Sequence, residues 1–203
     1  MKHKPTPERK IVLEDRSIGF ALCGSFCTHS RALAALETLS TQYSRIIPIV
    51  SEISATTDTR FGTANELIQK LTLLCGRPVL SSIREAEPIG PQGLLDLLVI
   101  APCTGNTLSK MAAGITDSTV TMAAKAQLRN GRPVLICMAS NDGLSGSAPA
   151  IGQFLMRKNV FFVPFGQDNP TGKPTSLIAD FQQLPAAIEC ALNNVQLQPL
   201  LLR

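Results

Sequence analysis

One stretch of the chain gathers small polar side chains of the kind that hold anions. In "APCTGNTLSK" (101–110) an apolar run stops at Pro102 and is followed by Thr104, Gly105, Asn106 and Thr107. Hydroxyls, an amide and a glycine at a helix start suit a phosphate, because N–H groups point outward there and the helix dipole favours negative charge. Capping of the helix by Thr104 or Asn106 would explain the same residues.

Three more loops carry similar residues. "GSFCTH" begins at Gly24 and places Ser25 before a helix, which suits a phosphate, although helix capping by Thr28 or Ser30 would explain it equally. It is not the GxGxxG of a dinucleotide fold, and Glu52 is only a weak candidate for the acidic residue of such a fold. The other two loops are "SEISATTDTRFG", which opens at Ser51 and contains Arg60, and "ASNDGLSGSAP", with Asn141 and Asp142.

Nucleophilic chemistry has little support in the sequence. Cys103 would lie at a helix start, where the pKa of a thiol can fall, but no base follows it and the chain has only His3 and His29. A Ser–His–Asp triad would need His29 as its base. The six cysteines are dispersed, without a CxxC pair or zinc spacing, so we expect buried reduced thiols and no metal.

These residues must be positioned by alternating strands and helices. Apolar runs predict strands at 17–24, 45–51, 77–83, 94–102, 131–140 and 159–165, with a loop at 166–176. Helical spacing predicts helices at 31–42, 62–76, 106–113, 119–129, 148–158 and 184–194. Such alternation is typical of a three-layer α/β/α sandwich around a mostly parallel, doubly wound sheet of the Rossmann or flavodoxin kind. Ligands bind beyond the carboxyl ends of those strands, where the polar loops fall.

Composition limits the classes of function. The chain has 203 residues, 44% of them hydrophobic, which suffices for one domain, expected at 17–195 between a flexible basic tail (1–16) and a C-terminal tail (196–203). The net charge is +4, but a good part of the basic charge lies in the tail, and the chain has no Trp and a single Tyr; this argues against nucleic-acid binding. Because no apolar run approaches the ~20 residues that span a bilayer, we expect a cytoplasmic protein without a membrane partner.

A family resemblance adds to this interpretation. "LLDLLVIAPCTGNTLSKMAAGITDS" resembles the ADL-viAPaSANT segment of flavin-binding cysteine decarboxylases, "SIGFALCGSF" resembles their first strand and phosphate loop, and "GRPVLICMASN" resembles a later strand ending in P-A-M-N. The likeness covers about residues 17–166. It implies bound FMN, and a substrate carboxylate that meets Asn106, with Asn141 as the second catalytic candidate. The implied FMN contacts are Gly24, Ser25, Phe26, Ser51, Pro102, Thr104, Asn106 and Thr107.

The chain departs from the decarboxylases at one position. Counting back from Asp96, their catalytic histidine corresponds to Pro88, which argues against cysteine decarboxylation. The variant "PIGPQGLLDLLVIAPCTGNT", with "SNDGLSG" downstream, is most similar to the family of dipicolinate synthase B subunits.

That likeness implies an oxidoreductase subunit and its partners. An A subunit would carry NADP, and the pair would oxidise a dihydrodipicolinate-type precursor to pyridine-2,6-dicarboxylate in the mother cell of a spore-forming bacterium. We also expect a homo-oligomer. Lys125, Arg129 or Lys173 could hold the small dicarboxylate or simply face solvent. The alternatives are a stand-alone FMN-dependent decarboxylase, a flavin prenyltransferase, or a non-catalytic flavin- or anion-binding scaffold.

Overall fold

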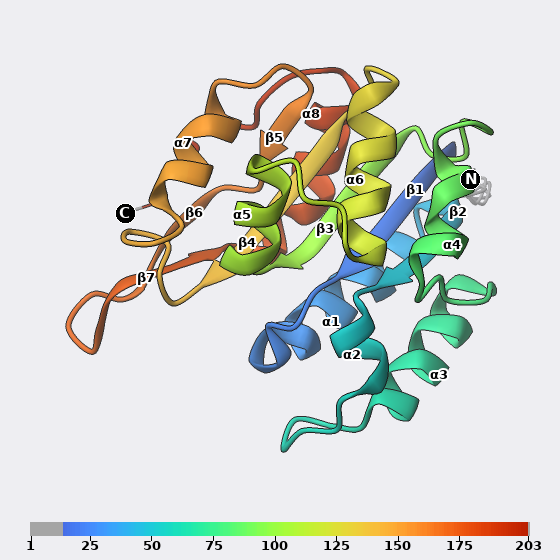
Figure 1. Ribbon diagram of the computed structural model, residues 1–203, viewed down its shortest axis with the longest axis horizontal. Coiled ribbons are helices and arrows are strands. Elements are labelled where there is room, and N and C mark those ends of the chain that lie inside the picture. The colour runs from blue at the N-terminus through green and yellow to red at the C-terminus, as the bar shows by residue number, and fades with distance from the viewer. Residues whose placement is uncertain (1–13, 203) are drawn as a thin grey trace, which may run out of the picture.

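The structure, a computed structural model, describes residues 14–202 and has the expected three layers (Figure 1). Its strands are β1 (Glu14–Leu22), β2 (Tyr43–Val50), β3 (Leu97–Cys103), β4 (Val134–Ser140), β5 (Val160–Phe162), β6 (Phe165–Asn169) and β7 (Lys173–Ala179). Its α-helices are α1 (His29–Ser40), α2 (Glu52–Thr56), α3 (Ala64–Cys75), α4 (Ile83–Ala86), α5 (Gly105–Ala112), α6 (Thr119–Arg129), α7 (Ala148–Leu155) and α8 (Leu184–Leu192). Short 3₁₀ turns are η1 (Phe26–Thr28), η2 (Glu87–Ile89) and η3 (Phe181–Gln183).

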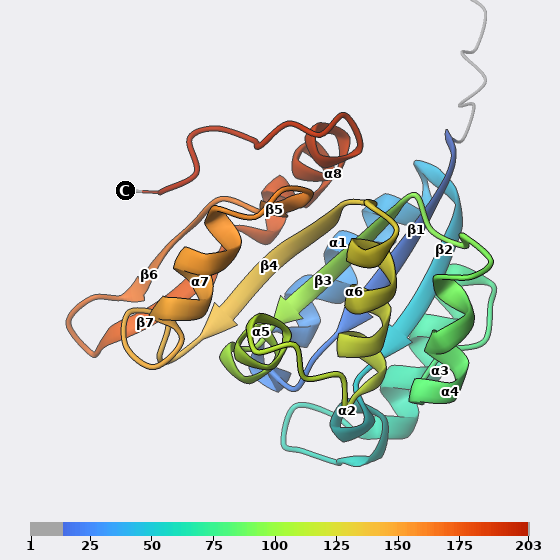
Figure 2. The same ribbon diagram turned by 45° about the horizontal axis from the view of Figure 1, so that its top comes forward.

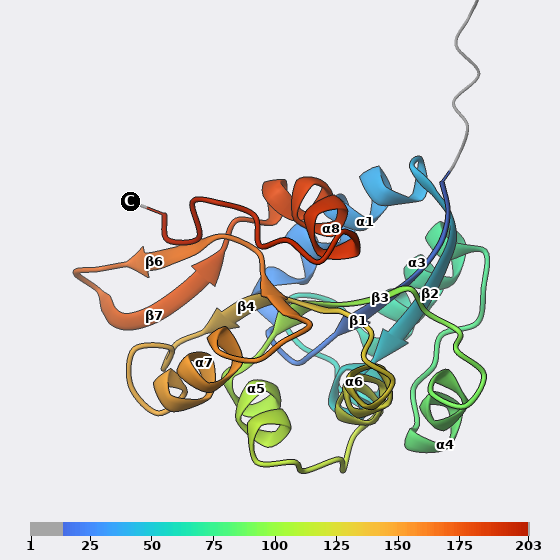
Figure 3. The ribbon, with the colours of Figure 1, turned by 90° about the horizontal axis from the view of Figure 1, so that it is seen from above.

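Five parallel strands form the centre of the sheet, in the order β2-β1-β3-β4-β5. This is the doubly wound order of flavodoxin-like folds, and the direction of winding changes between β1 and β3. Strand β3 is buried along its whole length, as a strand covered on both faces must be. Helices α1 and α8 cover one face of the sheet, and α5, α6 and α7 cover the other (Figure 3). The predicted α/β sandwich is confirmed.

Helix boundaries follow capping signals. Helix α3 begins with a capping box, in which the Thr63 hydroxyl accepts from the Glu66 N–H, and it ends at Gly76 with φ +61°. The end of β3 differs from the sequence-based expectation. The strand continues through Pro102 to Cys103, and its register against β4 is irregular after Ile100. Pro102 therefore lies within the strand end and does not stop it.

Two sequence-based expectations are wrong. Residues 77–83 were expected to form a strand, but Leu80 makes only an isolated parallel bridge to Ile49. A second capping box, Ser82 with Glu85, starts α4 immediately afterwards and leaves no room for a longer strand. The loop expected at 166–176 is instead the antiparallel β6–β7 hairpin, whose mostly exposed residues lack the apolar alternation that identifies a strand.

The hairpin makes β4 a branched strand. Its first residues, Val134–Ile136, pair in parallel with β5, whereas Ala139 and Ser140 pair antiparallel with β7. Figure 2 shows the hairpin at the end of the sheet opposite β2. The regular alternation of strand and helix thus ends at β5.

The two chain ends bear on the expected tails. Residues 14–16 belong to β1, and the rest of the proposed basic tail lies outside the described residues. Residues 196–202 run beside β5 and β6: the Gln196 side chain bonds both backbone groups of Phe162, and the Leu202 N–H donates to the Phe165 carbonyl at 2.9 Å. This segment therefore packs on the domain.

Candidate functional site at the β1–β3 strand ends

The carboxyl ends of the first three strands meet at the switch point between β1 and β3. The Cys23 N–H donates to the Pro102 carbonyl at 3.1 Å, and the Ser51 N–H donates to the Leu22 carbonyl at 2.9 Å. The Thr107 hydroxyl lies 3.2 Å from the Cys23 sulfur. Three of the loops selected from the sequence are thereby brought together where doubly wound folds bind ligands.

The loop after β1 presents groups without partners. The Thr28 N–H and hydroxyl both donate to the Ser25 carbonyl, at 2.9 and 2.8 Å, which folds the loop into η1. Within the described part of the chain the Ser25 hydroxyl makes no hydrogen bond, and the first N–H groups of η1, those of Phe26 and Cys27, have no intrahelical acceptor. Thr28 does not cap α1 through its side chain. The loop thus offers hydrogen-bond donors to an anion.

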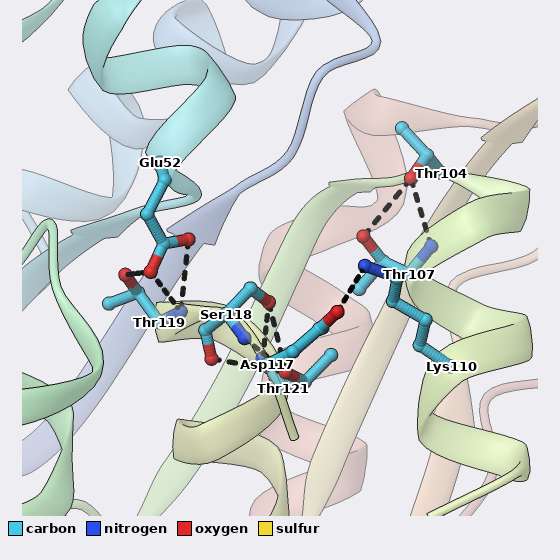
Figure 4. A network of polar contacts seen from close by, with 8 residues as sticks. All are labelled: Glu52, Thr104, Thr107, Lys110, Asp117, Ser118, Thr119 and Thr121. Atoms are coloured by element: carbon cyan, nitrogen blue, oxygen red, sulfur yellow. Dashed lines mark hydrogen bonds and ion pairs between the residues drawn. The ribbon is translucent and has the colours of Figure 1, made fainter. Parts of the chain in front are cut away.

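The loop after β3 uses its hydroxyls internally. Thr104 caps α5: its hydroxyl accepts from the Thr107 N–H at 3.2 Å and donates to the Thr107 hydroxyl at 3.1 Å (Figure 4). The capping interpretation of Thr104 is correct, and Thr107 completes the chain of bonds to Cys23. The backbone N–H groups of Gly105 and Asn106 remain for an acceptor from outside the helix, and the Asn106 side chain is exposed.

The loop after β2 forms a helix that the sequence did not reveal. Ser51 is buried and caps α2, since its oxygen accepts from the Ser54 N–H at 3.4 Å and lies 3.0 Å from the Ser54 hydroxyl. The next residue, Glu52, reaches across to α6: its carboxylate accepts from the Thr119 N–H at 2.9 and 3.2 Å and from the Thr119 hydroxyl at 2.8 Å (Figure 4). Glu52 is thus a structural bridge between α2 and the N-terminus of α6.

The loop after β4 places a carboxylate against the start of α5. Asp142 accepts from the hydroxyls of Ser140 and Ser147, the latter at 2.8 Å, and these bonds lower its pKa, so it is ionised at neutral pH. A Cβ on Gly105 would lie 2.6 Å from Asp142 Oδ1 and would also press on both serine hydroxyls, so the close approach requires glycine. Sequence reasoning noted Asp142 only as a polar loop residue, although Ser140 two positions earlier is typical of a turn.

Asn141 lies beside that carboxylate but does not reach α5 itself. Its side chain is exposed, and its backbone carbonyl accepts from the Thr175 hydroxyl at 2.7 Å, which ties the loop to β7. The structure records no contact between Asn141 and Asn106. The two predicted polar candidates therefore lie on neighbouring loops of the same edge, separated by Asp142.

The thiols and the imidazole at this edge are not poised as nucleophile and base. Cys103 and Cys23 are buried, and burial raises the pKa of Cys103 well above its usual value and that of Cys23 to about 11. Burial also lowers the pKa of His29, and its Nε2 lies 2.8 Å from the Cys23 carbonyl oxygen, which a neutral Nε2–H satisfies. The structure thus supports the assignment of Cys103 to the core.

The cavity next to the switch point is smaller than a second cavity elsewhere on the protein. A cavity of about 300 Å³ is lined by Phe26, His29 and Phe61, and so adjoins the loop after β1. A larger one of about 1090 Å³, lined among others by Arg31 and Asp180, contains none of the switch-point loop residues. The volume of a cavity therefore does not identify the binding site. The free hydrogen-bond donors that converge at the ends of β1 and β3 support the switch point as that site.

The basic residues considered for a dianion are separated. Lys173 lies on the hairpin and pairs with Asp168 at 3.4 Å, and Arg60 lies over the Phe61 ring at 4.8 Å. Lys125 and Arg129 instead line a cavity beside α5 and α6. Lys125, Arg129 and Lys173 thus lie outside the switch-point loops, whereas Arg60 lies near the end of the loop after β2, against Phe61.

The position of the decarboxylase histidine lies in η2. Pro88 is half-buried there, and its carbonyl accepts from the Gln92 N–H at 3.1 Å. The following Gly90 packs on α6, with its carbonyl accepting from the Asn130 side chain at 2.7 Å. Since the chain's histidines are His3 and His29, this position supplies no imidazole.

Two other kinds of site find no support within residues 14–202. No group of three or more His, Cys, Asp or Glu side chains there is arranged to hold a metal ion. No helix in that range is long and apolar enough to cross a bilayer.

The fold is that of a doubly wound α/β protein, and the chain belongs to the Flavoprotein family, whose sequence model matches residues 8–159. It is 44% identical over 189 residues to the B subunit of dipicolinate synthase from Bacillus subtilis (strain 168), which covers 93% of this chain and 94% of that protein. The crystal structure of the dipicolinate synthase B subunit from Bacillus halodurans C has a TM-score of 0.85 and the same identity, covering 93% and 96%. Both resemblances inferred from the sequence are confirmed.

A more distant structure shares the fold. DmrB from Burkholderia xenovorans, solved in complex with FMN and described as a cubic protein cage for redox transfer, has a TM-score of 0.61 at 17% identity. It covers 88% of this chain and 96% of its own. At this identity the likeness supports the fold alone.

Proposed function

We propose that this chain is the B subunit of a dipicolinate synthase. It acts with an A subunit that carries NADP, and the pair oxidises a dihydrodipicolinate-type precursor to pyridine-2,6-dicarboxylate during sporulation, in the mother cell. The observation that carries the proposal is the 44% identity to a dipicolinate synthase B subunit, which extends over 93% of this chain and 94% of that protein. A match of nearly full length at this identity supports a shared activity as well as a shared fold.

FMN is the proposed cofactor, held at the β1–β3 switch point. The donor set fits its phosphate: the Ser25 hydroxyl and the N–H groups of Phe26 and Cys27 have no acceptor among the described residues, and Gly24 adds no side chain beside Ile53 and Phe26. The start of α5 suits the phosphate less well, because the ionised Asp142 already lies against Gly105. When bound, the flavin would supply hydride-transfer chemistry, and the protein would orient it and the substrate.

The dicarboxylate is proposed to meet the two asparagines. Asn106 lies at the second position of α5 with an exposed amide and a free backbone N–H, and Asn141 extends from the next loop. Both side-chain amides have N–H groups that can donate to a carboxylate. Their role is to position the substrate, since neither amide can accept a proton at neutral pH.

The flavin proposal is tested by titrating the purified chain with FMN while recording the visible spectrum. Ser25→Asp places a negative charge where the phosphate is proposed, and about a tenfold loss of affinity or more is expected. Thr72→Asp, on an exposed residue of α3 outside the lining of the neighbouring cavity, is the control and should bind FMN like the wild type. If the protein never acquires flavin absorbance, the cofactor proposal is refuted, whereas the subunit proposal is not affected.

The subunit proposal is tested by an assay for pyridine-2,6-dicarboxylate with the A subunit alone and with both chains. We expect the pair to be active and the A subunit alone to be much less so. Asn106→Ala should weaken the pair, whereas Asn65→Ala, at the equivalent exposed position of α3, should not. Equal activity of the A subunit with and without this chain refutes a catalytic role. Turnover by this chain alone, with a decarboxylase or prenyltransferase substrate, would favour the alternative enzymes.

The chain is also proposed to form a homo-oligomer. The support is the description of the FMN-bound structural relative as a cage, together with exposed apolar side chains near the switch point, Ile53 and Phe61, at 55% and 53% exposure. Light scattering on the purified chain tests this, and a monomer at all concentrations contradicts it.

A further inference from the structure

A second cavity, which we call the α5–α6 cavity, lies outside the switch-point loops. It measures about 230 Å³ and is lined by the end of α5, one side of α6 and Arg157 after α7. The three helices lie side by side on one face of the sheet (Figures 1 and 3). The cavity begins where α5 ends, whereas the proposed flavin site uses the start of that helix.

The rim of this cavity is positively charged. Lys125, Arg129 and Arg157 all line it, and no Asp or Glu does. No ion pair joins any of the three to a carboxylate in the described chain, and the nearby Asp117 is bound by Lys110 at 2.8 Å (Figure 4). Arg157 instead lies over the Phe154 ring at 5.8 Å. A hollow lined by a single sign of charge attracts the opposite charge.

Stabilisation of helix ends explains this charge only in part. Arg129 is in the last turn of α6 and Arg157 follows the end of α7, where cations are favourable. Lys125 is in the middle of α6, four residues before Arg129, and like charges at this spacing weaken a helix by a few tenths of a kcal/mol. A bound anion would remove this repulsion.

The remaining lining is mixed but mostly apolar. Met111, Ile115 and Leu128 contribute hydrophobic side chains, and Thr116 and Thr121 contribute hydroxyls. The volume is below the roughly 300 Å³ at which drug-sized ligand sites begin, so a ligand of about one ring fits. The cations and the apolar side chains together suit a single-ring ligand that bears a carboxylate.

We propose that the α5–α6 cavity is a second binding site, for a small aromatic or heteroaromatic carboxylate. The class of ligand follows from the cavity, while the choice of pyridine-2,6-dicarboxylate as the first probe rests on the proposed function.

The test is calorimetric titration of the full chain, without FMN and without the A subunit, in metal-free buffer. The probes are pyridine-2,6-dicarboxylate, benzoate and inorganic phosphate. Because the cations are exposed, Arg129→Gln and Arg157→Gln should each raise the Kd of the dicarboxylate about fivefold, and the double variant about 25-fold. Lys158→Gln, on the exposed neighbour of Arg157 outside the lining, is the control and should bind like the wild type.

Each outcome decides the proposal. Weaker binding in the arginine variants, with phosphate weaker than either ring compound, supports it. Absence of binding, unchanged binding in the double variant, or phosphate as tight as the dicarboxylate overturns it. Binding lost in Asn106→Ala but not in the arginine variants also overturns it, because the probe then occupies the switch-point site. No turnover is measured, so failure here is independent of the proposed function.

Discussion

The bridge from Glu52 to α6 allows a quantitative prediction. Removing the carboxylate in Glu52→Ala deletes the acceptor of the Thr119 N–H and hydroxyl, and Thr119 is fully buried. Hydrogen bonds to a charged group contribute about 1.5–3 kcal/mol, and a carboxylate at a helix N-terminus adds about 0.3–1 kcal/mol. The expected loss is therefore about 3 kcal/mol. For a chain of this length that lowers Tm by about 6–12 °C.

Two further variants separate the bridge from ordinary capping. Glu52→Gln keeps a neutral acceptor and should lose about half as much stability. Glu66→Ala removes the carboxylate of the exposed capping box of α3 and should destabilise the protein clearly less than Glu52→Ala. Thermal melts followed by circular dichroism, with urea unfolding to obtain free energies, provide the measurement. A double-mutant cycle with Thr119→Ala should give a coupling of at least about 1 kcal/mol. If Glu52→Ala is no more destabilising than Glu66→Ala, or the coupling is near zero, the bridge does not stabilise the fold.

Three other predictions follow from burial and close packing. Because burial lowers the pKa of His29, the unfolded chain binds a proton below pH 6.5 that the folded chain does not. The free energy of unfolding should therefore fall as the pH is lowered from 7 to 5.5. His29→Gln should make this dependence on pH weaker. Iodoacetamide should label exposed Cys27 in the native protein and not buried Cys103, as peptide mass spectrometry would show; native labelling of Cys103 would contradict its burial. Gly105→Ala should destabilise by about 1–3 kcal/mol in melts, whereas Gly152→Ala, where a Cβ meets nothing, should be neutral or stabilising; equal effects would mean that the α5 start is loosely packed.

Much of the fold is predictable from periodicity, because buried parallel strands and amphipathic helices carry strong local patterns. Residues 119–129 form a helix with the predicted limits, and 94–102 contains most of β3. The β6–β7 hairpin was missed because its exposed residues give no apolar alternation. Helix α2 was missed because it is short and relies on Ser51 as its cap.

The site was predictable as a set of loops but not as a set of roles. Sheet topology brings the chosen loops together, and that follows from strand order. Strand order does not predict which hydroxyls remain free, because that depends on local helix capping. The Ser25 hydroxyl remains free, whereas the hydroxyls of Ser51 and Thr104 cap helices. The contact of Asp142 with Gly105 joins residues 37 positions apart in the chain, so no local pattern indicates it.

The branched pairing of β4 also sets the smallest fragment that can carry the site. The segment matched by the family model ends at residue 159, yet the loop bearing Asn141 is anchored by Thr175 of β7. The hairpin in turn packs against Leu202. A Cβ on Gly166 of β6 would lie 3.2 Å from the Leu202 carbonyl oxygen. A protein engineered to end at the family boundary would keep the β1 and β3 loops and lose the support of the β4 loop. Grafting, truncation or domain fusion should therefore treat residues up to 202 as a single unit.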